Sequence, residues 1–173
     1  KGSEPVTYLC NQITHSQRKE DLWIATVGCL ADGFIPEFYE EFSKKYADLY
    51  LDSKNAFNIL YNSRIGIIYK IFSFGLKDRT TSVIRMIKFL IEVKSPYDVL
   101  IESKENYSIF NRYTQVDKKF NKFFEKAKII ARKSGKLLFF QYGGDLGLSA
   151  DLSNLLLYEF PDKIIVVAYI KNV

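Results

Sequence analysis

Apolar and polar positions recur with a helical period over most of this chain. The clearest case is residues 110–134, where apolar residues at spacings of three, four and seven define one face of a long helix. Ser134-Gly135 follows as a helix stop signal. Shorter helices are predicted over residues 5–13, 37–50, 55–63, 65–74 and 80–93.

Two of the predicted elements are apolar on nearly all sides. Residues 80–93 carry only a narrow polar stripe, so we expect this helix to be largely surrounded by protein. Residues 21–30 form an almost unbroken apolar run rich in small side chains, which is buried whether it is helical or extended. The run ends at Ala31-Asp32-Gly33, and Pro36 prevents a simple helical continuation.

The pattern changes after Gly135 from helical to strand-like. Lys136–Tyr142 is predicted as a buried strand, Ser149–Phe160 as a helix with Ser149 at its N-cap, and Ile164–Ile170 as a second apolar strand. Such a β-α-β unit normally has parallel strands. The predicted fold class is therefore α/β, a helix-rich part followed by a β-α-β unit. Because a lone unit leaves open sheet edges, we expect more chain beyond Val173.

Composition narrows the class of protein. Hydrophobic residues make up 47% of the 173 residues, which is ample for a buried core and excludes general disorder. No apolar run approaches the roughly 18 residues needed to span a membrane. Cys10 and Cys29 are predicted as buried thiols of a cytoplasmic protein. The single histidine, His15, is expected on the surface. Two cysteines and one histidine at these spacings cannot form a zinc site.

Charge points to a phosphate-bearing partner without requiring one. The net charge of +5 is compatible with nucleic acid or another phosphate partner, but the excess is modest and many solvated surfaces carry the same charge. Lys118, Lys122 and Lys126 form a basic row at helical spacing, which would either follow a phosphate backbone or be the wet side of an amphipathic helix.

A glycine turn separates the first predicted strand from the helix that follows. Gly143-Gly144-x-x-Gly147 there has the setting of a phosphate cradle. Its spacing departs from the dinucleotide fingerprint, and Asp145 places a negative charge in the turn. A plain strand-to-helix turn is therefore the favoured interpretation.

Asp32 is the remaining candidate for chemistry. An aspartate followed by glycine at the end of an apolar segment is ordinarily a turn or capping residue. Its apolar setting, however, means that an ionised carboxylate needs a partner, and a divalent cation is one such partner.

These residues resemble a known family. Ile24–Pro36 is similar to the fourth motif of RecJ-like DHH-family phosphoesterases, in which a small apolar helix delivers an aspartate to a manganese site shortly before a proline. Gly147–Leu156, followed by Pro161-Asp162-Lys163, resembles the opening of the DHH-associated substrate-binding domain. Gly75–Thr81 is most similar to the archaeal-type members.

The resemblance implies a domain division and an activity. Residues 1–36 would end the DHH catalytic domain, 37–134 would be a helical insertion with an interdomain linker helix, and 135–173 would open the DHH-associated domain. The implied activity is metal-dependent hydrolysis of phosphodiester bonds in single-stranded DNA, RNA or short oligonucleotides. Asp32 would be one ligand of a Mn²⁺ or Mg²⁺ site. Lys118, Lys122 and Lys126 would border the substrate.

Departures from the family leave other functions open. Its Asp-x-Asp motif, second aspartate and Asp-His-His motif are absent, and the resemblance places them before Lys1, so we expect this chain to be an internal fragment that is inactive alone. Gly33 stands where bacterial members more often have an aliphatic residue. The alternatives are a catalytically inactive member serving as a scaffold with replication-complex proteins, and a cyclic-dinucleotide phosphodiesterase.

Overall fold

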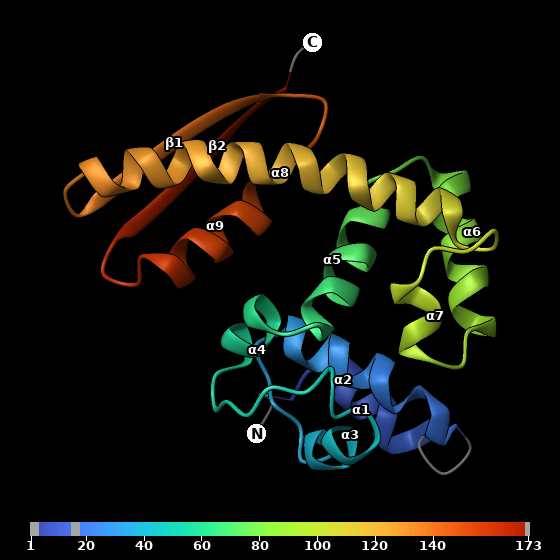
Figure 1. Ribbon diagram of the computed structural model, residues 1–173. Coiled ribbons are helices and arrows are strands. Elements are labelled where there is room, and N and C mark those ends of the chain that lie inside the picture. The colour runs from blue at the N-terminus through green and yellow to red at the C-terminus, as the bar shows by residue number, and fades with distance from the viewer. Residues whose placement is uncertain (1–3, 15–17, 172–173) are drawn as a thin grey trace. The chain divides into compact units, whose positions relative to one another are not determined.

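The computed structural model describes residues 4–14 and 18–171 (Figure 1). Within them the chain forms nine α-helices and one parallel two-stranded sheet. The predicted class, a helix-rich α/β fold with a C-terminal β-α-β unit, is confirmed. The chain divides into two units, Lys1–Tyr113 and Thr114–Val173, with the boundary inside the longest helix, α8 (Tyr107–Lys133).

Unit 1 is built from helices. They are α1 (Val6–Thr14), α2 (Leu22–Ala31), α3 (Tyr39–Lys45), α4 (Ala56–Asn62), α5 (Ile65–Gly75), α6 (Thr80–Glu92), α7 (Pro96–Leu100) and the start of α8, with a 3-10 turn at Lys19–Asp21. The central helix is α2, which packs against α1, α3, α4 and α5. Trp23 on α2 is fully buried, so the prediction that this apolar segment lies inside the protein is confirmed.

Close helix packing in unit 1 depends on two glycines. A Cβ at Gly28 on α2 would lie 2.5 Å from Thr7 Cγ2 on α1. A Cβ at Gly66, in the first turn of α5, would lie closer still to the backbone oxygen of Leu60 on α4. Larger side chains at either position would therefore force these helices apart.

The helix predicted over residues 37–50 is wrong in its length, because α3 ends at Lys45. The Tyr39 hydroxyl donates to the Leu51 carbonyl at 3.0 Å and accepts from the Leu51 N–H at 3.2 Å. Tyr46 and Leu49, which lie between the end of α3 and Leu51, are buried. Folding this segment back onto α3 therefore replaces the helical hydrogen bonds that a longer helix would have made.

The expectation that residues 80–93 are largely surrounded by protein is also wrong. In α6 only Met86 is buried, and the opposite side of the helix exposes Ile84, Ile87 and Ile91 by 49, 48 and 61%. Apolar side chains do lie on more than one side of α6, but unit 1 buries only one of these sides. A further helix that was not predicted, α7, begins at Pro96 with a capping box formed by Ser95 and Asp98.

Unit 2 contains the rest of α8, β1 (Leu137–Gly144), α9 (Ser149–Glu159) and β2 (Ile164–Lys171). The strands are parallel, with Leu137 opposite Ile164 and Gly144 opposite Lys171. Lys163, the residue before β2, caps the C-terminal end of α8. Its ammonium donates hydrogen bonds to the carbonyls of Ser134 and Gly135 at 2.8 and 2.7 Å.

Two predictions for unit 2 need correction. The first strand is buried on one face only: Leu138, Phe140 and Tyr142 point inward, whereas Leu137 and Phe139 are each 54% exposed. The N-cap of α9 is Leu148 rather than Ser149, since the Ser149 hydroxyl is paired with the Tyr142 hydroxyl at 3.2 Å.

Candidate functional site

Asp32 stands at the C-cap of α2. Gly33 follows with φ +75°, a left-handed conformation that glycine adopts without strain. The Gly33 N–H donates to the Leu30 carbonyl at 3.0 Å, and the Phe34 N–H donates to the Cys29 carbonyl at 2.9 Å. This pair of bonds is the Schellman pattern, which turns the chain out of the helix and leaves the Asp32 side chain exposed.

The electrostatic setting of Asp32 favours a cation. The last carbonyls of a helix carry partial negative charge, so a carboxylate at the C-cap is repelled by them. Burial first, and then the charges of Asp32 and Glu37, together raise the pKa of the nearby Cys29 thiol to about 11. Within residues 4–14 and 18–171, no side-chain hydrogen bond or ion pair engages the Asp32 carboxylate.

The described residues do not by themselves complete a metal site. Glu37 is the acid closest to this position in sequence, and it interacts with the Tyr8 hydroxyl, which raises the pKa of Tyr8. No cluster of three His, Cys, Asp or Glu side chains occurs in the described part of the chain. A Mn²⁺ or Mg²⁺ ion takes about six ligands, whereas Asp32 offers a single carboxylate, so a metal site at this position would need further ligands.

The three candidate lysines lie on successive turns of α8 in unit 2. Lys118, Lys122 and Lys126 are exposed, and none is joined to another described residue by a hydrogen bond or ion pair. Asp32 belongs to unit 1, so the candidate metal ligand and the candidate substrate-binding lysines are carried by separate units.

Lys122 lines a cavity. This cavity, of about 240 Å³, lies in unit 2 between α8 and the turn after β1, and is lined by Lys119, Lys122, Phe123 and residues 143–146. Lys119, which the sequence pattern did not single out, binds Asp145 with its ammonium 2.8 and 3.0 Å from the two carboxylate oxygens. Asp145 does place a negative charge in the turn, as expected, and Lys119 pairs with that charge.

A signal for Lys119 was available in the sequence. It lies four residues before Phe123 and next to the buried Phe120, so the helical period places it on the flank of α8 near the apolar face. The sequence pattern favoured Lys118, Lys122 and Lys126 instead, because their regular spacing is the more obvious feature.

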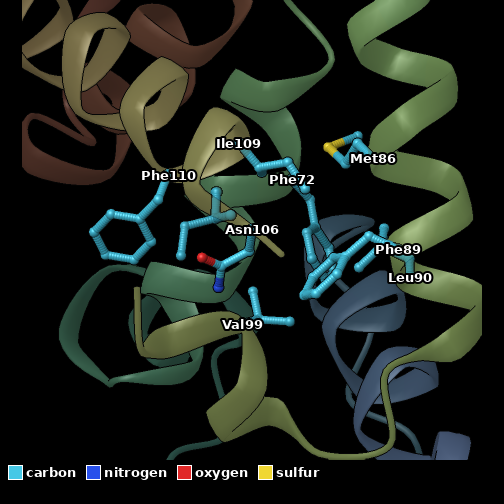
Figure 2. Close-up of a pocket in the computed structure, with 9 residues that line it drawn as sticks. Phe72, Met86, Phe89, Leu90, Val99, Asn106, Ile109 and Phe110 are labelled. Atoms are coloured by element: carbon cyan, nitrogen blue, oxygen red, sulfur yellow. The ribbon is translucent and has the colours of Figure 1, made fainter. Parts of the chain in front are cut away.

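An apolar pocket in unit 1 carries no chemistry. Figure 2 shows Phe72, Met86 and Phe89 lining it together with Asn106. The Asn106 side chain is buried and fully engaged, because its amide donates to the carbonyls of Asp98 and Ile101 and its oxygen accepts from the Ser103 N–H. The space among these side chains has no room for a water molecule, so we assign it to the core.

A wider groove in unit 1, of about 400 Å³, is acidic. Glu92, Asp98 and Glu105 line it beside apolar side chains, and no basic residue does. A hydrogen bond from Ser103 lowers the pKa of Glu105. Three carboxylates repel a phosphate, so this groove is unsuited to the predicted class of substrate.

The sequence-based assignment of the cysteines is half right. Cys29 is buried as predicted, whereas Cys10, on the outer side of α1, is exposed. His15 lies outside the described residues.

The chain matches no protein-family model, no curated protein and no solved structure. None of the helices in the described part of the chain combines the length and the apolar character that crossing a membrane requires.

Proposed function

We propose that this chain is part of a metal-dependent phosphodiesterase that acts on single-stranded DNA, RNA or short oligonucleotides. The observation that carries the proposal is the position of Asp32: an exposed carboxylate without a side-chain partner in the described residues, at the negative end of a buried helix. Such a carboxylate gains more from a divalent cation than from water alone.

In this proposal Asp32 supplies one oxygen ligand to a Mn²⁺ or Mg²⁺ site whose other ligands lie outside the described residues. When bound, the metal would supply an activated water for attack on phosphorus. The part played by this chain is to hold the Asp32 carboxylate in place: the buried α2 and the Gly33 turn fix its backbone. Lys118, Lys122 and Lys126 would attract the phosphates of the substrate.

We further propose a cytoplasmic location for this enzyme. The two cysteines are both free, one of them exposed, which suits a reducing compartment. A phosphodiesterase of nucleic acids would also find its substrate there.

One observation favours a second candidate, a catalytically inactive relative that acts as a scaffold with replication-complex proteins. The uncovered row of Ile84, Ile87 and Ile91 on α6 is the kind of helix face that protein partners cover.

The deciding experiment measures Mn²⁺-dependent hydrolysis of an end-labelled single-stranded oligonucleotide by the full-length polypeptide. Asp32→Asn keeps the shape of the side chain and removes its charge, and it should lower kcat at least about 100-fold. The matched control is Asp162→Asn, which changes an exposed aspartate in the turn before β2 and should leave turnover unchanged.

Undiminished turnover in Asp32→Asn would overturn the assignment of Asp32. If the unmodified polypeptide shows no hydrolysis stimulated by Mn²⁺ or Mg²⁺, the scaffold is the better account. Cleavage of cyclic dinucleotides in place of strands would identify the second-messenger phosphodiesterase.

A further inference from the structure

We propose that unit 2 binds a nucleoside phosphate in the cavity between α8 and the turn that joins β1 to α9. Lys122 and the backbone amides of the turn hold the phosphate, and the base lies against the ring of Phe123. This inference concerns unit 2 by itself and does not rest on the metal-dependent hydrolase proposed above.

The charges around the cavity favour an anion. Lys119 and Asp145 neutralise each other, with oxygen-nitrogen distances of 2.8 and 3.0 Å. Lys122 lines the same cavity and has no hydrogen-bonded or ionic partner in the described residues. The charged side chains of the lining therefore sum to one positive charge, and an ammonium without a counterion is a point of attachment for a phosphate.

The turn adds backbone donors. It follows the carboxyl end of a parallel strand and precedes a helix, the position at which α/β proteins bind phosphates. The N–H groups of Leu146 and Gly147 have no hydrogen-bond acceptor in the described part of the chain.

The space beside this turn is open. Gly144 has φ +150°, which a residue with a side chain rarely adopts. A Cβ built on Gly144 or Gly147 would meet no atom within 4 Å. The glycines are thus not required by packing inside unit 2, and they leave room for a ligand against the backbone.

The turn is held in place at both ends. The Tyr169 hydroxyl donates to the Gly144 carbonyl at 3.0 Å, and the Tyr142 hydroxyl accepts from the Leu148 N–H. Because Tyr142 is a buried residue of β1, these bonds fix the turn before any ligand arrives. A preorganised turn loses little conformational entropy on binding.

The ring of Phe123 favours binding of a nucleoside phosphate over phosphate alone. Phe123 is half-buried and lines the cavity, and its ring is held by Tyr142, with ring centroids 4.9 Å apart. A base that packs against such a ring gains affinity whatever its identity. The cavity, at about 240 Å³, is smaller than the roughly 300–1,000 Å³ of typical ligand sites, so one nucleotide unit is the largest ligand that fits.

The test is an NMR titration of the whole 173-residue chain with adenosine 5′-monophosphate (AMP), in buffer containing EDTA so that metal binding plays no part. We expect saturable shifts of the amide signals of residues 143–147. AMP should bind more tightly than inorganic phosphate or adenosine, each about tenfold weaker. Lys122→Gln should weaken AMP binding about tenfold.

Two further variants make the result specific. Lys133→Gln removes an exposed charge from the same helix away from the cavity and should change AMP affinity less than about twofold. Asp145→Asn frees Lys119 and should tighten AMP binding; Asp145 is 71% exposed, so folding should survive the change.

Three results would each overturn the inference. They are the lack of saturable shifts at residues 143–147, equal losses in Lys122→Gln and Lys133→Gln, and weaker binding in Asp145→Asn. Inorganic phosphate binding as tightly as AMP would overturn the assignment of a nucleoside.

Discussion

Asp32 illustrates how a single residue can oppose the local electrostatics of its helix. Its carboxylate meets the negative end of α2, where basic side chains are the stabilising choice. No described side chain compensates for this repulsion. A residue that lowers the stability of the fold at its position is a candidate for binding, because a role in function explains why a destabilising side chain stands there.

This argument predicts that Asp32→Asn stabilises the protein. Removing the charge relieves the repulsion, and the free energy of unfolding should rise by about 0.3–1 kcal/mol at low salt. Urea denaturation followed by the fluorescence of Trp23, the single tryptophan, measures it. Asp162→Asn in the turn before β2 is the control and should not change this value. Lower stability in Asp32→Asn would mean that the carboxylate makes a stabilising contact, and the electrostatic case for a metal ligand would be lost.

The two cysteines should differ in reactivity. Cys29 is fully buried and burial raises its pKa from 9.0 to about 11, whereas Cys10 is exposed. A thiol reagent at pH 8 should therefore modify Cys10 quickly and Cys29 only after unfolding. Rapid modification of both thiols in the folded protein would contradict the burial of Cys29.

The raised pKa of Cys29 also sets a pH dependence. Between pH 9 and about 11 the unfolded thiol has lost its proton while the folded one keeps it, so stability should fall as pH rises through this window. Tyrosines titrate in the same range, and Cys29→Ala removes the cysteine contribution alone. The decline in the free energy of unfolding should be shallower in Cys29→Ala than in the unmodified protein, and equal slopes would count against the shift.

At the scale of elements, the sequence predicted the helices better than their partners. The helical period located α5 and α6 within one residue at each end and α8 within three, because it depends on local geometry alone. Whether an apolar face is covered depends on chain that lies far away in sequence, and α6 and β1 were therefore predicted as buried on faces that are exposed. The early end of α3 has the same origin, since Tyr39 bonds to Leu51 twelve residues later.

The space around Gly66 in unit 1 and Gly135 in unit 2 predicts opposite effects when each glycine is changed to alanine. In Gly66→Ala the new Cβ would collide with the Leu60 backbone oxygen, which cannot rotate away, and we expect a loss of at least about 3 kcal/mol. In Gly135→Ala the Cβ meets no atom within 4 Å, and we expect a change within about 1 kcal/mol, toward higher stability. Thermal unfolding compares the two variants. Similar melting temperatures for both would show that α4 and α5 are not packed as closely as described.

At the scale of the molecule, the candidate sites differ in how far the sequence could locate them. Asp32 was found from a local motif, and the described residues add its helix-end geometry. For the cavity in unit 2, the sequence drew attention to Lys122 and to the glycine turn separately, but not to their meeting, because the cavity joins Lys119 on α8 to Asp145 across twenty-six positions of sequence. Neither a period nor a motif records that kind of pairing, and only the fold of unit 2 reveals it.

The division into two units predicts that their cores respond separately to mutation. Leu22 on α2 and Leu152 on α9 are both fully buried, one in each unit. Changing either to alanine should cost about 2–5 kcal/mol of local stability. Hydrogen exchange measured by mass spectrometry should then quicken in residues 18–113 for Leu22→Ala and in residues 114–171 for Leu152→Ala, because opening is cooperative within each unit.

Helix α8 is the informative segment in this experiment, since it contributes residues to both units. Its first two turns should respond to Leu22→Ala and its later turns to Leu152→Ala. Trp23 fluorescence gives an independent reading of unit 1 and should follow Leu22→Ala alone. If either substitution instead quickens exchange equally through the whole chain, the two cores unfold as one cooperative body.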